Sequence, residues 1–212
     1  MVAPPNLLRG PSIDAPYLAS YLETIPGPIV LAAHSYGGFV MTNAATGNEN
    51  VKALVYIDAF APDEGEIAGG LIANSGSCID PVTVPPENAF NLVPFAGGLD
   101  LYLRWEASGP YSGFAECFAN GVNKRDASVL AATQRPASAA QFEDPSGPPA
   151  WKEIPSWSLI GTRDNVIPPE LQEFMADRAG ATISRVKAGH LTPITRPGDV
   201  VKVILSAVDA TN

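Results

Sequence analysis

Strand-like apolar runs alternate with amphipathic helical stretches at both ends of the chain. The runs at 29–33 and 51–60 are largely apolar and β-branched, which is typical of strands covered on both faces of a parallel sheet. The predicted elements are helix 12–25, strand 29–33, helix 39–46, strand 51–60, strand 157–161, helix 168–179, strand 182–186 and helix 198–210. This order predicts an α/β fold with a mostly parallel, doubly wound sheet.

The middle of the chain differs from its ends in composition and in the pattern of apolar residues. Residues 61–150 are rich in proline, hold both cysteines and contain only short mixed segments. We therefore interpret 1–60 and 151–212 as one α/β core and 61–150 as an inserted, mainly helical and otherwise irregular cap. A length of 212 residues suits one domain with a sizeable insertion better than two independent domains.

The charge balance narrows the possible partners. Lys and Arg total 13 against 22 Asp and Glu, a formal net charge of -9. An acidic protein repels phosphate backbones and anionic lipids, so we expect neither a nucleic-acid nor a membrane partner. Residues 1–10 lack the basic start and the apolar stretch of an export signal, which predicts a cytoplasmic protein.

The cysteines qualify that prediction. Cys78 and Cys117 are isolated from each other, and no Cys/His cluster has zinc-ligand spacing, so we predict neither a metal nor another cofactor. The two thiols either form one disulfide or remain buried and free, and the sequence leaves both possibilities open. A disulfide would favour an oxidising compartment and a secreted protein whose export signal is absent from this sequence.

A candidate nucleophile lies where a predicted strand turns into a predicted helix. Residues 33–37 read Ala-His-Ser-Tyr-Gly, which matches the pattern G-x-S-x-G except for alanine at its first position. A sharp strand-to-helix turn holds its serine in a strained conformation and needs small residues two positions before and after it. Such a turn lifts the Ser35 hydroxyl above the sheet and points the amide of Tyr36 at a forming oxyanion.

A serine hydroxyl needs a base, and the chain offers two histidines. His34 is adjacent to Ser35 and is expected to point away from it and pack beside the site. His190 follows the predicted strand 182–186, and Asp164 follows the strand before it, so both lie where active-site residues of open sheets gather. Asp164 could also be a turn former, but its position favours the role of orienting the imidazole.

These motifs resemble those of the α/β-hydrolase-fold serine esterases. The similar segments read Ala-His-Ser-Tyr-Gly-Gly at 33–38, Gly-Thr-Arg-Asp-Asn-Val-Ile-Pro-Pro at 161–169 and Ala-Gly-His-Leu at 188–191, with a cap inserted after residue 60. The resemblance implies that Ser35 is the nucleophile, His190 the general acid and base, and Asp164 the orienting acid. It also implies a small carboxylic ester as substrate, cleaved through an acyl-enzyme on Ser35.

The chain resembles a short form of that family. Members usually have several strands before the segment that here begins at residue 1, and a loop after one of them supplies a second oxyanion donor beside the Tyr36 amide. The sheet should therefore have one exposed edge. Three accounts compete: a homodimer in which a second copy covers the edge, a fragment of a longer enzyme, and a substitute donor from the cap.

The cap is expected to supply the substrate pocket. Trp105, Phe114 and Phe118 could roof an apolar cleft, although such aromatics also form small cores of their own.

The alternatives to an esterase are a weak or inactive remnant that binds an apolar ligand or a partner, and a hydroxynitrile lyase or haloperoxidase that uses the same triad. The lyase would require a lysine facing the site, for which Lys124 is the candidate. Asp58 is expected to hydrogen-bond near the elbow.

Overall fold

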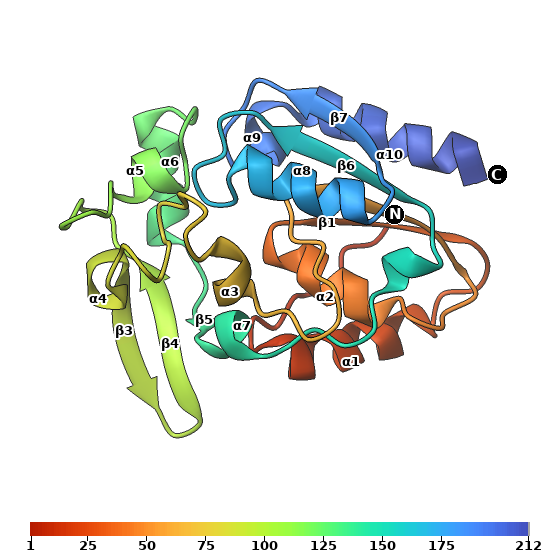
Figure 1. Ribbon diagram of the computed structural model, residues 1–212, viewed down its shortest axis with the longest axis horizontal. Coiled ribbons are helices and arrows are strands. Elements are labelled where there is room, and N and C mark those ends of the chain that lie inside the picture. The colour runs from red at the N-terminus through yellow and green to blue at the C-terminus, as the bar shows by residue number, and fades with distance from the viewer. Residues whose placement is uncertain (212) are drawn as a thin grey trace.

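The computed structural model describes residues 1–211 and contains a four-stranded sheet in the order β1-β2-β6-β7 (Figure 1). All three strand pairings are parallel, which confirms the predicted α/β fold with a mostly parallel sheet. The strands span Ile29–His34 (β1), Val51–Ile57 (β2), Ser156–Gly161 (β6) and Thr182–Val186 (β7). Strand β2 ends three residues earlier than predicted, because Asp58 adopts a φ of 43° and turns the chain away.

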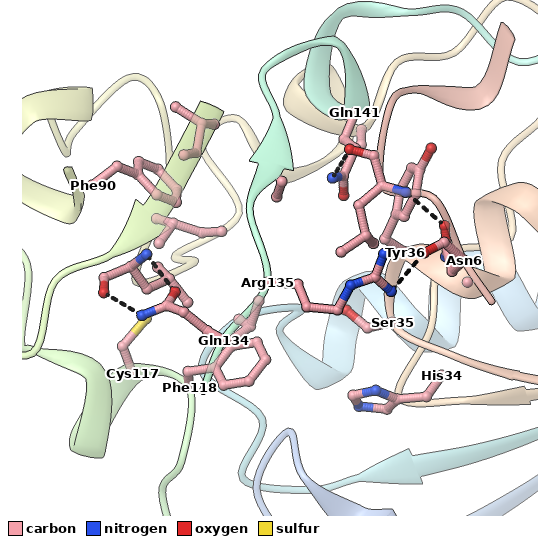
Figure 2. A pocket seen from close by; sticks show the side chains of 18 of the residues that line it. Asn6, His34, Ser35, Tyr36, Phe90, Cys117, Phe118, Gln134, Arg135 and Gln141 are labelled. Carbon is pink, nitrogen blue, oxygen red and sulfur yellow. Dashed lines mark hydrogen bonds between the residues drawn. The ribbon is translucent and has the colours of Figure 1, made fainter. Parts of the chain in front are cut away.

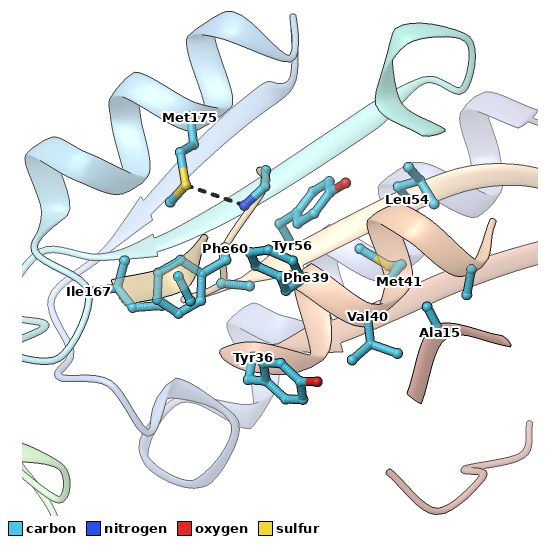
Figure 3. Close-up of a cluster of buried hydrophobic side chains, with 14 of the residues drawn as sticks. Ala15, Tyr36, Phe39, Val40, Met41, Leu54, Tyr56, Phe60, Ile167 and Met175 are labelled. Atoms are coloured by element: carbon cyan, nitrogen blue, oxygen red, sulfur yellow. Dashed lines mark hydrogen bonds between the residues drawn. The ribbon is translucent and has the colours of Figure 1, made fainter. Parts of the chain in front are cut away.

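Helices cover both faces of this sheet. Alternate residues of β2 point to opposite sides, so Leu54 and Tyr56 join a core with α2 and α8, whereas Val55 and Ile57 pack under α10. Figure 3 shows the first core between α2 and the sheet, with α1 packed on the outside of α2. The helices span Pro11–Leu22 (α1), Tyr36–Ala44 (α2), Pro169–Arg178 (α8), Thr192–Thr195 (α9) and Pro197–Thr211 (α10).

The cap contains a small sheet that the sequence did not predict. Strands β3 (Phe90–Phe95) and β4 (Gly98–Leu103) form an antiparallel hairpin, and β5 (Ala137–Ser138) pairs with β4. The description of the cap as mainly helical and otherwise irregular missed this sheet, because most residues of β3 are exposed and show no alternation of apolar and polar positions. The cap helices are Ala68–Ile72 (α3), Pro86–Ala89 (α4), Phe114–Cys117 (α5), Lys124–Ala132 (α6) and Ala140–Glu143 (α7), followed by the 3-10 turn Ala150–Lys152.

A disulfide joins Cys78 to Cys117 across a separation of 39 residues. It decides between the two possibilities left open by the sequence. The amide of Cys78 also donates to the carbonyl of Asn165 at 2.8 Å. The bridge therefore joins two segments of the cap, and the amide of Cys78 links them to the loop that follows β6.

Strand β1 lies at one edge of the four-stranded sheet. Within residues 1–211 it pairs only with β2, so its other edge is open, as expected from the sequence. Residues 1–6 face this strand across a hollow of about 430 Å³, which α2 and Ile204 of α10 also line. No helix among residues 1–211 is long and apolar enough to cross a membrane.

Candidate active site

Ser35 occupies a strained turn between β1 and α2. Its backbone has φ 54° and ψ -127°, a conformation that L-residues other than glycine rarely adopt. The chain passes tightly through this turn: a Cβ added at Gly37 would lie 3.4 Å from the Cβ of Ala33, and one at Gly38 would overlap the carbonyl oxygen of Phe60. The small residues of the motif thus serve the strand-to-helix turn that the sequence predicted.

A continuous hydrogen-bond chain runs from Ser35 through His190 to Asp164. His190 Nε2 lies 2.9 Å from Ser35 Oγ, and His190 Nδ1 lies 2.8 Å from Asp164 Oδ2. The three residues follow β1, β7 and β6, so the carboxyl ends of these parallel strands bring them to one edge of the sheet. The arrangement can transfer the serine proton to the imidazole and stabilise the imidazolium that forms.

Asp164 is held in place by several donors. Its Oδ1 accepts from the amides of Val166 and Ile167 at 2.8 and 3.0 Å, and its Oδ2 accepts from Gln172 Nε2 as well as facing His190. The side chain is fully buried. These bonds fix the carboxylate, so it can orient the imidazole without losing freedom during the reaction.

His190 is fully buried, and its pKa reflects two opposed effects. Burial lowers the pKa, but the neighbouring Asp164 carboxylate outweighs burial and leaves the pKa of His190 raised above its ordinary value of 6.5. Phe118 of the cap covers the imidazole, with its ring centroid 5.1 Å from that of His190. The imidazole of His190 is thus covered by the cap on one side and paired with a carboxylate on the other.

His34 lies beside Ser35, as expected, and contacts the backbone of His190. Burial and the proximity of His190 lower the pKa of His34 to about 3, so the ring is neutral at ordinary pH. Its Nε2 lies 2.7 Å from the carbonyl oxygen of His190. Because that oxygen can only accept, Nε2 carries the proton and donates to it, which steadies the loop that presents His190.

Asp58 hydrogen-bonds to the end of β6 and to the segment that follows His190. Its carboxylate accepts from the amide of Gly161, the last residue of β6, at 2.7 Å and from the amide of Thr192, two residues after His190, at 3.3 Å, so neither contact lies at the elbow. Burial raises the pKa of Asp58 to about 6. It stands at the end of β2 and does not contact Ser35 or the ring of His190 through a hydrogen bond in residues 1–211.

The amide of Tyr36 is available to an oxyanion because Tyr36 is the first residue of α2, where backbone N–H groups have no partner within the helix. The helix dipole adds to this positive potential. The phenol of Tyr36 has a separate role, because its hydroxyl donates to buried Asp14 at 2.8 Å. Burial, followed by this bond, raises the pKa of Tyr36 far above its ordinary value, so the phenol stays neutral.

Ser35 opens into a pocket of about 470 Å³ between the core and the cap (Figure 2). Phe114 and Phe118 line it, as the sequence predicted. Trp105 does not line it: it stacks on Phe114 at 6.3 Å and, like Lys124, borders a separate hollow. The pocket is mostly apolar, and its other large side chains include Phe60, Phe90, Leu101, Leu103 and Phe142.

Three further residues of this pocket had no signal in the sequence. Asn6 and Leu8 reach it from the N-terminal segment, and Arg135 reaches it from the stretch between α6 and β5. None belongs to a motif or to a periodic element, so only the tertiary arrangement could place them. Among residues 1–211, no cluster of His, Cys, Asp and Glu has the arrangement of a metal site.

Comparison with protein families gives one match over most of the chain. Residues 8–203 match the family described as "Alpha/beta hydrolase family". A carbendazim hydrolyzing esterase from Nocardioides sp. (strain SG-4G) is 37% identical over 101 residues, which cover 46% of this chain. That segment covers 37% of the esterase, so the match spans little more than a third of the relative's length.

Solved structures share the fold at low sequence identity. A pyrethroid hydrolase from Sphingobium faniae JZ-2 superposes with a TM-score of 0.67 at 18% identity, over 95% of this chain and 78% of that one. A methylesterase from Arabidopsis gives 0.70 at 16% identity, over 96% and 80%. An extracellular α/β-hydrolase from a Paenibacillus species gives 0.67 at 19% identity, over 97% and 83%. At such identities the likeness establishes the fold alone.

Proposed function

Because this chain belongs to the alpha/beta hydrolase family, we propose that it is a serine hydrolase that cleaves small carboxylic esters through an acyl-enzyme on Ser35. The single observation that carries the proposal is the chain of 2.9 and 2.8 Å contacts that joins Ser35, His190 and Asp164 at the mouth of an apolar pocket. The names of the relatives add support, since the curated relative is an esterase.

In the first half of the reaction, Ser35 Oγ attacks the ester carbonyl carbon while His190 Nε2 takes the hydroxyl proton. The carbonyl oxygen becomes an oxyanion next to the Tyr36 amide and the start of α2. When the C–O bond to the alcohol breaks, the imidazolium returns its proton to the leaving oxygen. The alcohol departs and the acyl group stays on Ser35.

In the second half, water replaces the alcohol. His190 removes a proton from the water as it attacks the acyl carbon, and it then protonates Ser35 Oγ as the acid leaves. Asp164 keeps Nδ1 protonated throughout, so Nε2 is the nitrogen that accepts and donates. The neutral, fixed His34 holds the backbone carbonyl of His190 and adds no competing charge.

The proposal is tested with p-nitrophenyl esters of short acids and with a fluorophosphonate probe. Replacement of Ser35 by Ala should lower kcat roughly 10⁴- to 10⁶-fold, as loss of a triad nucleophile does in such enzymes. The probe should modify the wild-type protein once per chain, with the label on Ser35. Equal ester turnover by the wild type and by Ser35→Ala would overturn the proposal.

A matched control distinguishes chemistry from damage to the fold. Ser20 is an exposed serine on α1 whose hydroxyl only contacts the carbonyl of Pro16. The Ser20→Ala variant should turn over esters and take up the probe like the wild type. Folded wild-type protein that takes up no probe would favour the alternative, a remnant that binds an apolar ligand without reacting.

The lyase alternative has less support from the pocket. No lysine lines it among residues 1–211, and Lys124 borders the separate hollow beside Trp105. A haloperoxidase-type reaction would use the same triad with hydrogen peroxide in place of water. Comparison of ester hydrolysis with and without peroxide distinguishes the two.

Two further proposals concern the cellular compartment and the oligomeric state of the protein. We propose that it works in an oxidising compartment, since Cys78 and Cys117 are paired, and one structural relative is described as extracellular. We also propose a homodimer in which a second copy covers the open edge of β1, because unpaired strand edges invite pairing. Light scattering measures this directly, and a monomer mass of 22.2 kDa would contradict it.

A further inference from the structure

Arg135 places a cation in the pocket that contains Ser35. It lies in the segment between α6 and β5 of the cap, and its guanidinium donates to the carbonyl oxygen of Asn6 at 2.8 Å. Figure 2 shows its side chain reaching from the cap strand toward Asn6 and the region of Ser35 and Tyr36. The contact with Asn6 thus holds the guanidinium at the junction of cap and core.

Arg135 carries the only formal charge among the residues that line this pocket. Those residues include no Asp, Glu or Lys, and the pKa of His34 is lowered to about 3, so that ring is neutral. Arg135 also makes no ion pair with a carboxylate within residues 1–211. Arg135 therefore brings a positive charge to the pocket that no lining residue balances.

The other polar side chains near Arg135 are engaged by the protein itself. The amide of Gln134 exchanges hydrogen bonds with the backbone of Leu103, and that of Gln141 donates to the carbonyl of Leu8. The hydroxyl of Thr133 bonds to the carbonyl of Val129. Arg135, an exposed side chain that lines the pocket, uses one nitrogen for Asn6; its other N–H donors bond to no group in residues 1–211, and no carboxylate lines the pocket.

We propose, on the basis of the proposed esterase function, that the natural substrates are esters bearing a carboxylate at a distance from the scissile bond, and that Arg135 binds this carboxylate. A planar guanidinium matches a carboxylate in a bidentate geometry. The apolar walls, including Phe114 and Phe118, pack against the hydrocarbon between the two groups. Half-esters of dicarboxylic acids have this composition. The carboxylate takes no part in bond making and only orients the ester on Ser35.

The test compares two substrates of equal chain length, the p-nitrophenyl half-ester of glutaric acid and the p-nitrophenyl ester of pentanoic acid. The Arg135→Gln variant should raise KM for the half-ester about 5- to 50-fold, the range for a charge-assisted contact at a partly exposed site. Its kcat for the half-ester and both constants for pentanoate should change less than about twofold. Arg135→Lys should recover part of the affinity for the half-ester, since lysine keeps the charge but cannot bind the carboxylate in a bidentate geometry.

A matched control is Arg125→Gln, which removes a charge from the exposed face of α6 outside the pocket and should leave both substrates unaffected. An equal fall in kcat for both esters in Arg135→Gln would overturn the proposal and make Arg135 an oxyanion donor. Unchanged constants for both would also overturn it. Thermal unfolding of each variant shows whether loss of the contact with Asn6 has loosened the N-terminal segment.

Binding separates this proposal from the esterase function. Calorimetric titration of Ser35→Ala with monoethyl glutarate should show binding that weakens in the double variant with Arg135→Gln, while ethyl pentanoate binds both alike. If the anion binds in this way but the wild type hydrolyses no ester, the esterase function fails and the anion site stands. If esters are hydrolysed but charge makes no difference to binding, the anion site fails and the esterase function stands.

Discussion

The core wall and the cap wall of the pocket differ in how they hold their side chains. On the core wall, Ser35, Asp164 and His190 stand at the ends of parallel strands, and each is joined to the next by a hydrogen bond. On the cap wall, Phe114 and Phe118 come from a helix of four residues and the residue after it, in a segment anchored by a disulfide. The core wall is fixed by the sheet, and the cap wall by one cross-link, by side-chain packing and by hydrogen bonds to the loop after β6, such as that from Asn165 Nδ2 to the carbonyl of Glu116 at 2.8 Å.

Because of this difference, we expect the core wall to determine the rate of the reaction and the cap wall to determine which substrates bind. In the proposed mechanism the core wall contributes the reactive groups, and its Asp164 raises the pKa of His190, whereas the cap wall contributes apolar surface and one cation. Substitutions on the core wall should therefore lower kcat for every substrate. Substitutions on the cap wall should change KM and stability and leave the reactive serine intact.

The largest effect is expected for Asp164→Asn on the core wall. An asparagine can still accept from the amides of Val166 and Ile167, but it turns an N–H₂ group toward His190 Nδ1. That favours the tautomer with the proton on Nε2, which cannot take the proton of Ser35, and kcat should fall about 10⁴-fold. Steady-state kinetics with p-nitrophenyl acetate measures this.

The control for that variant is Asp63→Asn, which changes a turn aspartate that is paired with Lys152 and does not line the pocket. Its kcat should equal that of the wild type. Retention of more than about a tenth of the activity in Asp164→Asn would contradict the role given to Asp164, since a correctly placed acid contributes far more than that.

Removal of the disulfide is the strongest expected change on the cap wall. The double variant Cys78→Ala, Cys117→Ala loses a cross-link over 39 residues, so its free energy of unfolding should fall by about 3 to 4 kcal/mol. KM should rise more than kcat falls, because α5 carries Phe114 into the pocket. Urea unfolding and ester kinetics give the two quantities.

Wild-type protein treated with a phosphine reductant should behave like the double variant in both measurements. A variant that remains folded but no longer reacts with a fluorophosphonate would show that the cap fixes the reactive groups. That outcome would remove the distinction between the two walls.

The pH profile is expected to show the smallest and most specific difference. The proposed mechanism requires neutral His190, whose pKa is raised, so kcat/KM should increase with pH along an acid limb centred above pH 6.5. The acid limb of the residual activity of Asp164→Asn should lie at lower pH than that of the wild type, because this variant lacks the carboxylate that raises the pKa of His190. Arg135→Gln on the cap wall should leave the limb in place.

The same shift has a consequence for stability. A folded-state pKa above the unfolded value means that His190 contributes stability below pH 6.5, and that this contribution disappears as the pH rises through the folded pKa. Urea unfolding of the wild type and of Asp164→Asn at pH 6 and pH 9 checks the sign. A larger difference between the two proteins at pH 9 than at pH 6 would contradict it.

The sequence by itself determined the core, the elbow and three residues that meet there. Each signal was local: apolar runs of strand length, small residues around Ser35, and polar residues directly after strands at 164 and 190. In a parallel sheet, strand ends converge on one edge, so position along the chain was enough to predict proximity in space. The fold class follows from the same alternation of strands and helices.

Only the tertiary structure decided how the cap is built and what it brings to the pocket. Strand β3 is largely exposed and has no apolar alternation, so it gave no strand signal; in β4 Leu99, Leu101 and Leu103 do alternate with other residues, but the sequence showed no partner strand for it. The pairing of Cys78 with Cys117, the exclusion of Trp105 and the inclusion of Arg135 all depend on segments far apart in sequence. In irregular chain, such contacts arise from packing rather than from a repeating pattern, and no local rule predicts them.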